Sequence, residues 1–169
     1  NIYKGNITVL NKSVTKIPSL PNRYDLIITD PPYLDDVIYG EFSMFFYVWF
    51  YRCVSEHFPE LPKHVPLEED FCQAWGRFGD NALAADFFKA GLKKSFEAMN
   101  QSLKNDGLLV VFFAHSSTEA WDLLLNCVRN AKFQVVSSYA IHTESTSNVI
   151  ARNKAAFMSS VVIACRKLP

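Results

Sequence analysis

The apolar residues of this chain gather in short continuous runs and in longer helical stretches, and the two patterns alternate along the sequence. Five short apolar runs predict strands, and they lie at residues 7–10, 24–29, 108–114, 133–141 and 159–165. Three longer stretches predict helices, at residues 41–52, at residues 84–103, and from a cap at Ser116 or Ser117 through Val128. This alternation predicts an α/β fold with a mostly parallel sheet and helices on both faces. Because no helix follows the final run, we expect the last two strands to be antiparallel neighbours.

The predicted helices differ in where they place their apolar residues. Residues 41–52 are apolar nearly all round, which is typical of a helix buried on most sides. We therefore interpret the run from Phe45 to Phe50 as core. Residues 84–103 carry lysines between apolar positions, so this helix should lie along the outside of the sheet and end before the turn Asn105-Asp106-Gly107.

Two segments interrupt the regular alternation. Residues 57–66 hold three prolines and residues 68–79 have ambiguous spacing, so we expect an insertion at about residues 57–83. Residues 142–158 form a long, mostly polar linker between the last two strands, and such linkers are usually functional.

Length and composition limit the class of protein. With 169 residues, of which 49% are hydrophobic, the chain should form one domain. Seventeen basic residues balance seventeen acidic ones, so any nucleic-acid partner would have to meet local positive charge. No apolar stretch reaches the length of a membrane span, and we expect no membrane partner. Because the sequence starts at Asn1 without a leader, we expect it to be part of a longer protein.

The four cysteines are widely spaced and form no C-x-x-C pair, which is typical of reduced thiols in a cytoplasmic protein. Cys53 and His57 lie four positions apart, with His64 and Cys72 downstream. Because this spacing fits no usual zinc pattern, we favour buried cysteines and surface histidines and predict no metal.

The sequence YDLIITDPPY at residues 24–33 joins a predicted core strand, buried on both faces, to an acid, two prolines and an aromatic ring. Open α/β sheets bind their ligands at the carboxyl ends of such strands. Proline restricts its own backbone and the residue before it, so the Asp30 carboxylate and the Pro31 carbonyl should be held rigidly. Two fixed acceptors beside the Tyr33 ring suit a planar ligand with an exocyclic amino group. The alternative is a simple strand-ending turn, because Asp-Pro-Pro is also good loop chemistry.

Two further stretches join Asp30-Pro31-Pro32-Tyr33 in a family pattern, namely LDDVIYGEFSMFFYVW at residues 34–49, and HTE at 142–144 with IAR at 150–152 and IACR at 163–166. With them the chain resembles the Rossmann-like S-adenosyl-L-methionine-dependent methyltransferases. It is similar to large prokaryotic adenine-specific DNA methylases that contain a domain of unknown function. The resemblance covers most of the chain and is weakest at residues 59–83. It implies a methyltransferase sheet, mostly parallel, with a final antiparallel strand.

The resemblance also implies roles for individual residues. In such enzymes the target adenine is flipped out of the duplex, and its amino group is held by the aspartate and by the following proline carbonyl. Those roles would fall to Asp30 and Pro31, with Pro32 completing the motif and the Tyr33 ring stacking on the base. Two hydrogen bonds would favour the pyramidal nitrogen that attacks the methyl group, so no covalent nucleophile is needed.

The remaining candidates each have a structural alternative. Tyr39 could line the base pocket or simply pack at the start of a helix. Three residues of the long linker could bind substrate or form solvated surface: His142, Glu144 and Arg152. Asn6 occupies the place where related enzymes often carry an acidic residue near the cofactor adenine, and with Asp30 it is our candidate for cofactor binding.

One expected motif is absent from the sequence. Methyltransferases of this fold hold the methionine part of the cofactor with a glycine-rich turn, F-x-G-x-G, after their first strand, and none of the six glycines forms it. No apolar run before residue 7 matches the first strands of the fold either. We therefore expect this chain to be the catalytic part of a methyltransferase that lacks its first strands. A preceding segment of the same protein, or a partner chain, would supply the glycine turn.

Three functions remain open on the sequence alone. The leading hypothesis is methylation of the N6 amino group of adenine in DNA. The second is amino-methylation of a base in RNA, because D-P-P-Y also occurs in RNA enzymes. The third is a methyltransferase-like module without catalysis that binds a partner or a nucleic acid.

Overall fold

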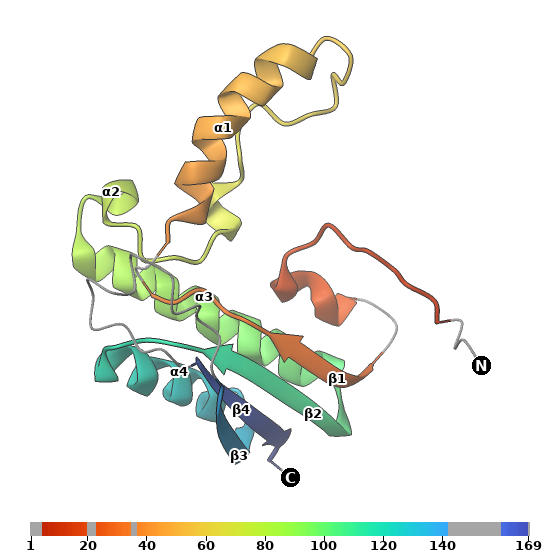
Figure 1. Cartoon of the computed structure of the whole chain (residues 1–169), viewed down its shortest axis with the longest axis vertical. Helices are drawn as coiled ribbons and strands as arrows, with labels where there is room; N and C mark the ends of the chain where they lie inside the picture. The colour runs from red at the N-terminus through yellow and green to blue at the C-terminus, as the bar shows by residue number, and fades with distance from the viewer. Residues whose placement is uncertain (1–4, 20–22, 35–36, 142–159, 169) are drawn as a thin grey trace.

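Strand β1 (Tyr24–Thr29) lies beside β2 (Leu103–Phe113), and the two run parallel. The structure is a computed structural model that describes residues 5–19, 23–34, 37–141 and 160–168. Its sheet continues from β2 to β4 (Ser160–Lys167) and ends at β3 (Phe133–Ile141), which gives the order β1-β2-β4-β3 (Figure 1). Within these residues the chain is therefore a mixed α/β structure around one four-stranded open sheet.

The expectation of a mostly parallel sheet is wrong for the strands that the structure describes. Only β1 and β2 pair in parallel, because β4 is antiparallel to both β2 and β3. Three strands still point the same way, but β4 inserts between two of them and makes both of its own pairings antiparallel. The antiparallel pairing of the last two strands is confirmed. Hydrophobic pattern alone could not tell whether the last strand joins an edge or enters the middle.

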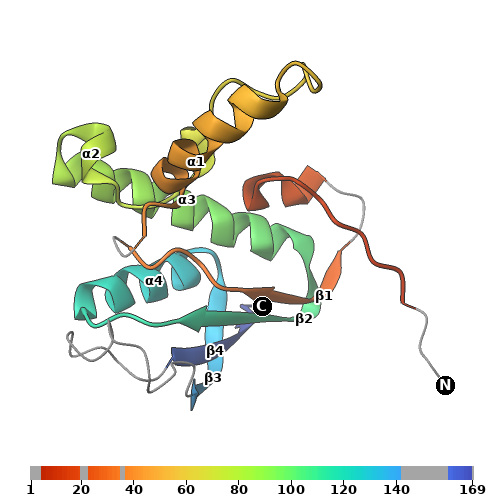
Figure 2. The same ribbon diagram turned by 45° about the horizontal axis from the view of Figure 1, so that its top comes forward.

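Helices α3 (Asn81–Ser102) and α4 (Thr118–Asn130) pack against each other and against the same face of the sheet (Figure 2). One core cluster joins Phe96 of α3 and Leu124 of α4 to Leu109 and Val111 of β2. The prediction of helices on both faces is therefore wrong within the described ranges. The opposite face carries the alternate residues of the strands, such as Ile28 beside Val110, and no described helix covers it.

Strand β1 is not buried on both faces as expected. It forms the edge of the described sheet, and Leu26 and Ile28 are 49% and 62% exposed. Their partners across the strand pair, Leu108 and Val110, are only half-buried. A run that is apolar on both faces indicates that burial is favourable, but it does not show what provides the cover.

The prediction of a first strand at residues 7–10 is also wrong. Residues 5–13 form neither strand nor helix, and Ile7 and Val9 are about nine-tenths exposed. A strand needs a neighbour for its backbone N–H and C=O groups, and no described strand lies beside this run. The chain then forms a short 3-10 helix, η1 (Val14–Ser19), which packs on α3.

Helix α1 (Tyr39–Val54) forms where the sequence predicts a helix, but it is not buried. It projects from the body of the molecule on the far side of α3 from the sheet (Figures 1 and 2). Six large apolar side chains are between 46% and 68% exposed: Phe42, Phe45, Phe46, Val48, Trp49 and Phe50. The interpretation of residues 45–50 as core is therefore wrong within the described structure. Their apolar character favours burial, but no described surface lies against them.

The helix ends agree only in part with the prediction. Asp80, which the sequence pattern did not single out, caps α3, because its Oδ1 accepts hydrogen bonds from the backbone N–H groups of Ala82 and Leu83. Ser117 rather than Ser116 caps α4 and accepts from the Ala120 N–H. The expected turn at residues 105–107 does not separate α3 from the next strand, because β2 begins directly at Leu103. These residues instead lie within a register irregularity between β1 and β2.

The segment between α1 and α3 contains the short helices η2 (Leu67–Glu69) and α2 (Trp75–Phe78). The helical spacing of residues 68–79 forms an α-helix only over the four residues of α2, and the insertion expected at about residues 57–83 stays a prediction. Among the described helices, none combines the length and apolar character needed to cross a membrane.

Candidate active site

The motif Asp30-Pro31-Pro32-Tyr33 directly follows β1, at the end where the parallel neighbour β2 also finishes. Thr29, the last residue of β1, pairs with Val111, two residues before the end of β2. The side chains that follow β1 therefore meet those that end β2. Pro31 is buried, whereas Asp30 is exposed, so the turn is anchored at the proline and presents the acid to solvent.

The Tyr33 side chain folds back over this turn. Its hydroxyl donates a hydrogen bond to Asp30 Oδ1, with 2.5 Å between the oxygen atoms. Its ring contacts the buried ring of Phe113 at the end of β2, edge to face, with 5.3 Å between the centroids. Trp121 also packs on Phe113, with 4.9 Å between centroids, and its indole N–H donates to the carbonyl of His115. An aromatic ring and a carboxylate are thus held next to each other by two strands and one helix.

Two cavities flank the turn. The larger has a volume of about 350 Å³, and its lining consists of the motif and two residues that follow it: Asp30, Pro31, Pro32, Tyr33, Val37 and Tyr39. That volume lies within the range of small-molecule sites, roughly 300–1,000 Å³. The smaller cavity, about 130 Å³, lies on the other side of the prolines against η1 and α3 and is lined mainly by apolar side chains. The Asp30-Pro31-Pro32 backbone is therefore a wall between two spaces.

The predicted site residues are only partly brought together. The four motif residues and Tyr39 line the larger cavity, although Tyr39 itself is 58% exposed. Asn6 lies in the exposed N-terminal stretch and lines neither cavity. Three candidates fall outside the described residues: His142, Glu144 and Arg152.

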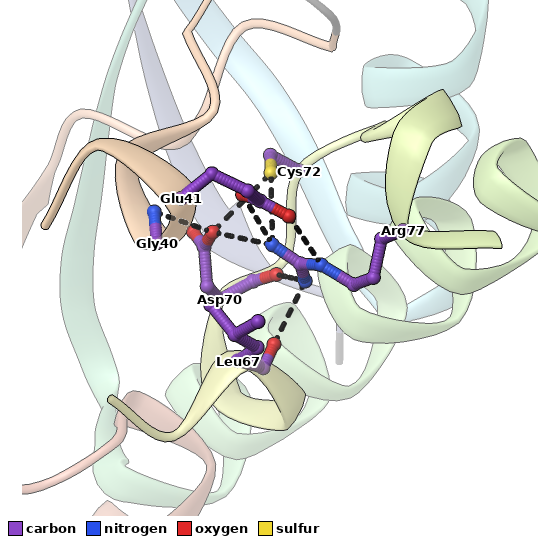
Figure 3. Close-up of polar contacts among 6 residues, drawn as sticks. All are labelled: Gly40, Glu41, Leu67, Asp70, Cys72 and Arg77. Atoms are coloured by element: carbon purple, nitrogen blue, oxygen red, sulfur yellow. Dashed lines mark hydrogen bonds and ion pairs between the residues drawn. The ribbon is translucent and has the colours of Figure 1, made fainter. Parts of the chain in front are cut away.

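Sequence reasoning missed Val37, which lines the larger cavity between the motif and Tyr39. Its position between the two aromatic residues was visible, but a single valine carries no chemical signature. It also missed a partly buried polar cluster at the base of α1, where an arginine contacts two carboxylates, a thiol and two backbone carbonyls (Figure 3). Its members come from α1, η2, α2 and the turn between them: Gly40, Glu41, Leu67, Asp70, Cys72 and Arg77.

The cluster is electrostatically complementary. Arg77 holds Glu41 through two parallel hydrogen bonds, each 2.8 Å long. This contact lowers the pKa of the Glu41 carboxyl below its ordinary value, with desolvation acting in the opposite direction. Burial raises the pKa of the Cys72 thiol to about 11, helped by its hydrogen bond to Asp70, so the thiol is neutral at pH 7.

Glu41, Asp70 and Cys72 have the residue types of a metal site, and their ligand atoms lie within 4.8 Å of one another. The Arg77 guanidinium contacts all three, however, and supplies the positive charge that a metal would bring. We therefore assign no metal to this cluster. The expectation of buried cysteines holds for Cys72 but not for Cys53, which is exposed on α1.

Comparisons with known proteins find similarity only at the level of a solved structure. No family model matches the chain, and no curated protein sequence matches it. Among solved structures, one similar protein is a candidate DNA modification methylase from Thermus thermophilus, at 12% sequence identity and a TM-score of 0.47. The match covers 93% of this chain and 51% of that protein, so the chain spans about half its length.

Proposed function

We propose that this chain is the acceptor-binding part of an S-adenosyl-L-methionine-dependent methyltransferase that methylates the N6 amino group of adenine in DNA. The observation that carries the proposal is the arrangement of Asp30, Pro31 and Tyr33 around a cavity at the end of β1. A rigid carboxylate, a rigid carbonyl and a flat ring are the groups that an adenine with its exocyclic amine requires. In this assignment Pro32 completes the rigid turn, and Tyr39 lines the same cavity.

The proposed chemistry uses the chain's own groups. One amino hydrogen of a flipped adenine would be held by the Asp30 carboxylate and the other by the Pro31 carbonyl, while the Tyr33 ring stacks on the base. Both bonds direct the nitrogen lone pair out of the ring plane, and they strengthen as positive charge develops on that nitrogen in the transition state. The proton that the nitrogen then loses would pass to the Asp30 carboxylate or to water.

S-adenosyl-L-methionine would supply an electrophilic methyl group. The described residues do not form a complete site for it, because the chain has no F-x-G-x-G turn and Asn6 lines neither cavity. Of the two predicted cofactor contacts, only Asp30 lies at the turn.

The uncovered surfaces support the proposal that more chain completes the domain. The outer edge of β1 has no described neighbour, and Leu26 and Ile28 expose apolar surface on the uncovered face of the sheet. Unpaired edges and apolar faces are normally covered in native proteins. We propose that an additional segment of the same protein, or a partner chain, packs here and carries the glycine turn.

The test uses the complete protein, DNA and methyl-labelled S-adenosyl-L-methionine, with digestion to nucleosides and mass detection of N6-methyladenine. Asp30→Asn and Asp30→Ala should reduce methyl transfer by at least about a hundredfold, the scale of losing a preorganised transition-state contact. Asp25→Asn is the matched control, because Asp25 is an exposed aspartate at the other end of the same strand.

Equal transfer by the wild type and both Asp30 variants would refute the assignment of Asp30. A labelled product recovered from RNA but not from DNA would replace the proposed substrate. Failure of the complete protein to bind S-adenosyl-L-methionine in calorimetry would favour a module without catalysis.

A further inference from the structure

The strand-ending turn and the start of α1 are held by one segment of chain. Residues 67–77 form hydrogen bonds with the chain on both sides of the cavity residues Val37 and Tyr39, at Leu34 and at Gly40. At the first, the backbone N–H of Gln73 donates to the carbonyl of Leu34, at 2.9 Å. At the second, Asp70 Oδ2 accepts from the Gly40 N–H, also at 2.9 Å. The cavity residues Val37 and Tyr39 lie in sequence between these two anchor points.

Arg77 is the centre of the second anchor. Its guanidinium donates to both carboxylate oxygens of Glu41 and to Asp70 Oδ2, at 2.8, 2.8 and 2.9 Å. The remaining nitrogen donates to the carbonyls of Leu67 and Asp70, at 2.8 and 2.9 Å. The side chain is only 13% exposed. Every donor direction of the guanidinium fork is therefore used, as Figure 3 shows.

The first turn of α1 packs closely on residues 67–77 at this anchor. Gly40 is buried, and a Cβ atom there would lie 2.6 Å from both Asp70 Oδ2 and a methyl carbon of Leu67. The glycine lets the first turn of α1 approach the 67–77 segment closely enough for Arg77 to reach Glu41. Gly40 and Glu41 directly follow Tyr39, which lines the larger cavity. A change in the contact between Arg77 and Glu41 would therefore also move Tyr39.

We infer that Arg77 is a positioning residue, which fixes Tyr39 and Val37 against the Asp30–Tyr33 turn and so sets the shape of the acceptor cavity. The inference rests on the proposed function and adds to it a residue that never touches the base. A bidentate pair suits this role, because the planar fork fixes direction as well as distance. Lysine would keep the charge but could not reproduce the fork.

The first experiment measures kcat and KM for DNA methylation by the complete protein. We expect Arg77→Ala to lower kcat/KM by about a hundredfold, since displacement of a substrate-positioning group by about 1 Å has effects of that size. Arg77→Lys should fall between Arg77→Ala and the wild type. Arg129→Ala is the matched control, because Arg129 is exposed in the last turn of α4 and lines neither cavity, and it should leave kcat/KM unchanged.

A double-mutant cycle with Tyr39→Ala separates positioning from a general loss of structure. If Arg77 acts through Tyr39, Arg77→Ala should lower kcat/KM by less than about threefold in the Tyr39→Ala background. The effects of the two substitutions are then not additive. A loss of about a hundredfold in both backgrounds would overturn the inference. So would a variant Arg77→Lys with wild-type kinetics, since the fork would then be unnecessary.

The contacts of Arg77 with Glu41 and Asp70 form a clamp on the start of α1. Hydrogen exchange tests this clamp without any methylation assay. In Arg77→Lys the amide of Gly40 and the first turn of α1 should exchange at least about tenfold faster than in the wild type, while core amides of β2 stay unchanged. Unchanged exchange at Gly40 would overturn the clamp. If instead exchange responds as expected but Asp30→Asn leaves methylation unaffected, the clamp stands and the proposed function of the turn fails.

Discussion

Replacement of Gly91 by alanine separates what helix propensity predicts from what the packing predicts. Gly91 lies in the middle of α3, where alanine normally stabilises a helix by about 1 kcal/mol relative to glycine. In the structure, however, a Cβ at Gly91 would lie 2.2 Å from the Cγ of Phe71 and 2.8 Å from its Cβ. Carbon atoms in contact sit about 3.5–4.0 Å apart, so Phe71 would have to move by more than about 1 Å. Its Cβ is fixed to the backbone and cannot swing away.

Overpacking of this kind costs about 1–3 kcal/mol, and the short distance favours the upper end. After the propensity gain is subtracted, we expect Gly91→Ala to lower the free energy of unfolding by about 1–2 kcal/mol. That corresponds to a fall in Tm of about 2–8 °C for a chain of this size. Gly76→Ala in α2 is the matched control, because a Cβ there meets nothing within 4 Å. It should leave stability unchanged or raise it by up to about 1 kcal/mol.

Urea unfolding followed by tryptophan fluorescence measures both variants, and a third variant makes the test specific. In a Phe71→Ala background the clash with the ring is gone and only the 2.8 Å contact with the Cβ of residue 71 remains, so Gly91→Ala should destabilise the protein less than it does in the wild type. A Gly91→Ala protein as stable as the wild type would refute the packing of Phe71 on α3. That packing holds the segment which carries Asp70, Cys72 and Arg77 against the core, so the result also bears on the clamp.

Three further predictions concern the core, the motif and one thiol. Phe96→Ala should lower the free energy of unfolding by about 3–5 kcal/mol, whereas Phe46→Ala on the exposed α1 should change it by less than about 0.5 kcal/mol in urea titrations. Tyr33→Phe keeps the ring against Phe113 and removes the donor to Asp30, so kcat for methylation should fall about tenfold with KM for DNA nearly unchanged. Burial raises the pKa of the Cys165 thiol from its ordinary 9.0 to about 11, so its contribution to stability is complete below pH 9 and is lost as the pH rises toward 11. The stability of Cys165→Ala should therefore decline less than that of the wild type between about pH 8 and pH 10.5 in the same titrations.

Local signals in the sequence predict the elements of the sheet that have neighbours. Residues 133–141 and the final run are expected to form an antiparallel pair, and they pair as β3 and β4. Ser117 is one of two candidate caps, and it caps α4 through the Ala120 N–H. Strand runs and helix caps are decided within a few residues, which is why a sequence alone shows them.

The surfaces that would bury the exposed apolar residues could not be predicted, because they are distant in the sequence. The apolar character of residues 41–52 predicts helix α1 but also suggests burial that the described chain does not provide. The same holds for Leu26 and Ile28 on β1. In both places the local sequence favours burial of these apolar side chains. The surface that would bury them is not among the described residues.

The candidate site shows the same division. Asp30 and Tyr33 stand out because their spacing and their place after a strand carry chemical meaning, and both line the larger cavity. The Arg77 cluster cannot be recognised in the sequence, because Glu41 and Arg77 are 36 positions apart and only the fold brings them together. A charged residue that works through tertiary contacts leaves no periodic or spacing signal.

The most direct test of the central claim is the amount of N6-methyladenine that the complete protein forms in DNA with and without the Asp30 carboxylate. We predict formation by the wild type and by Asp25→Asn, and a loss of at least about a hundredfold in Asp30→Asn. The same amount of N6-methyladenine from Asp30→Asn as from the wild type would contradict the claim that this turn holds the acceptor amine.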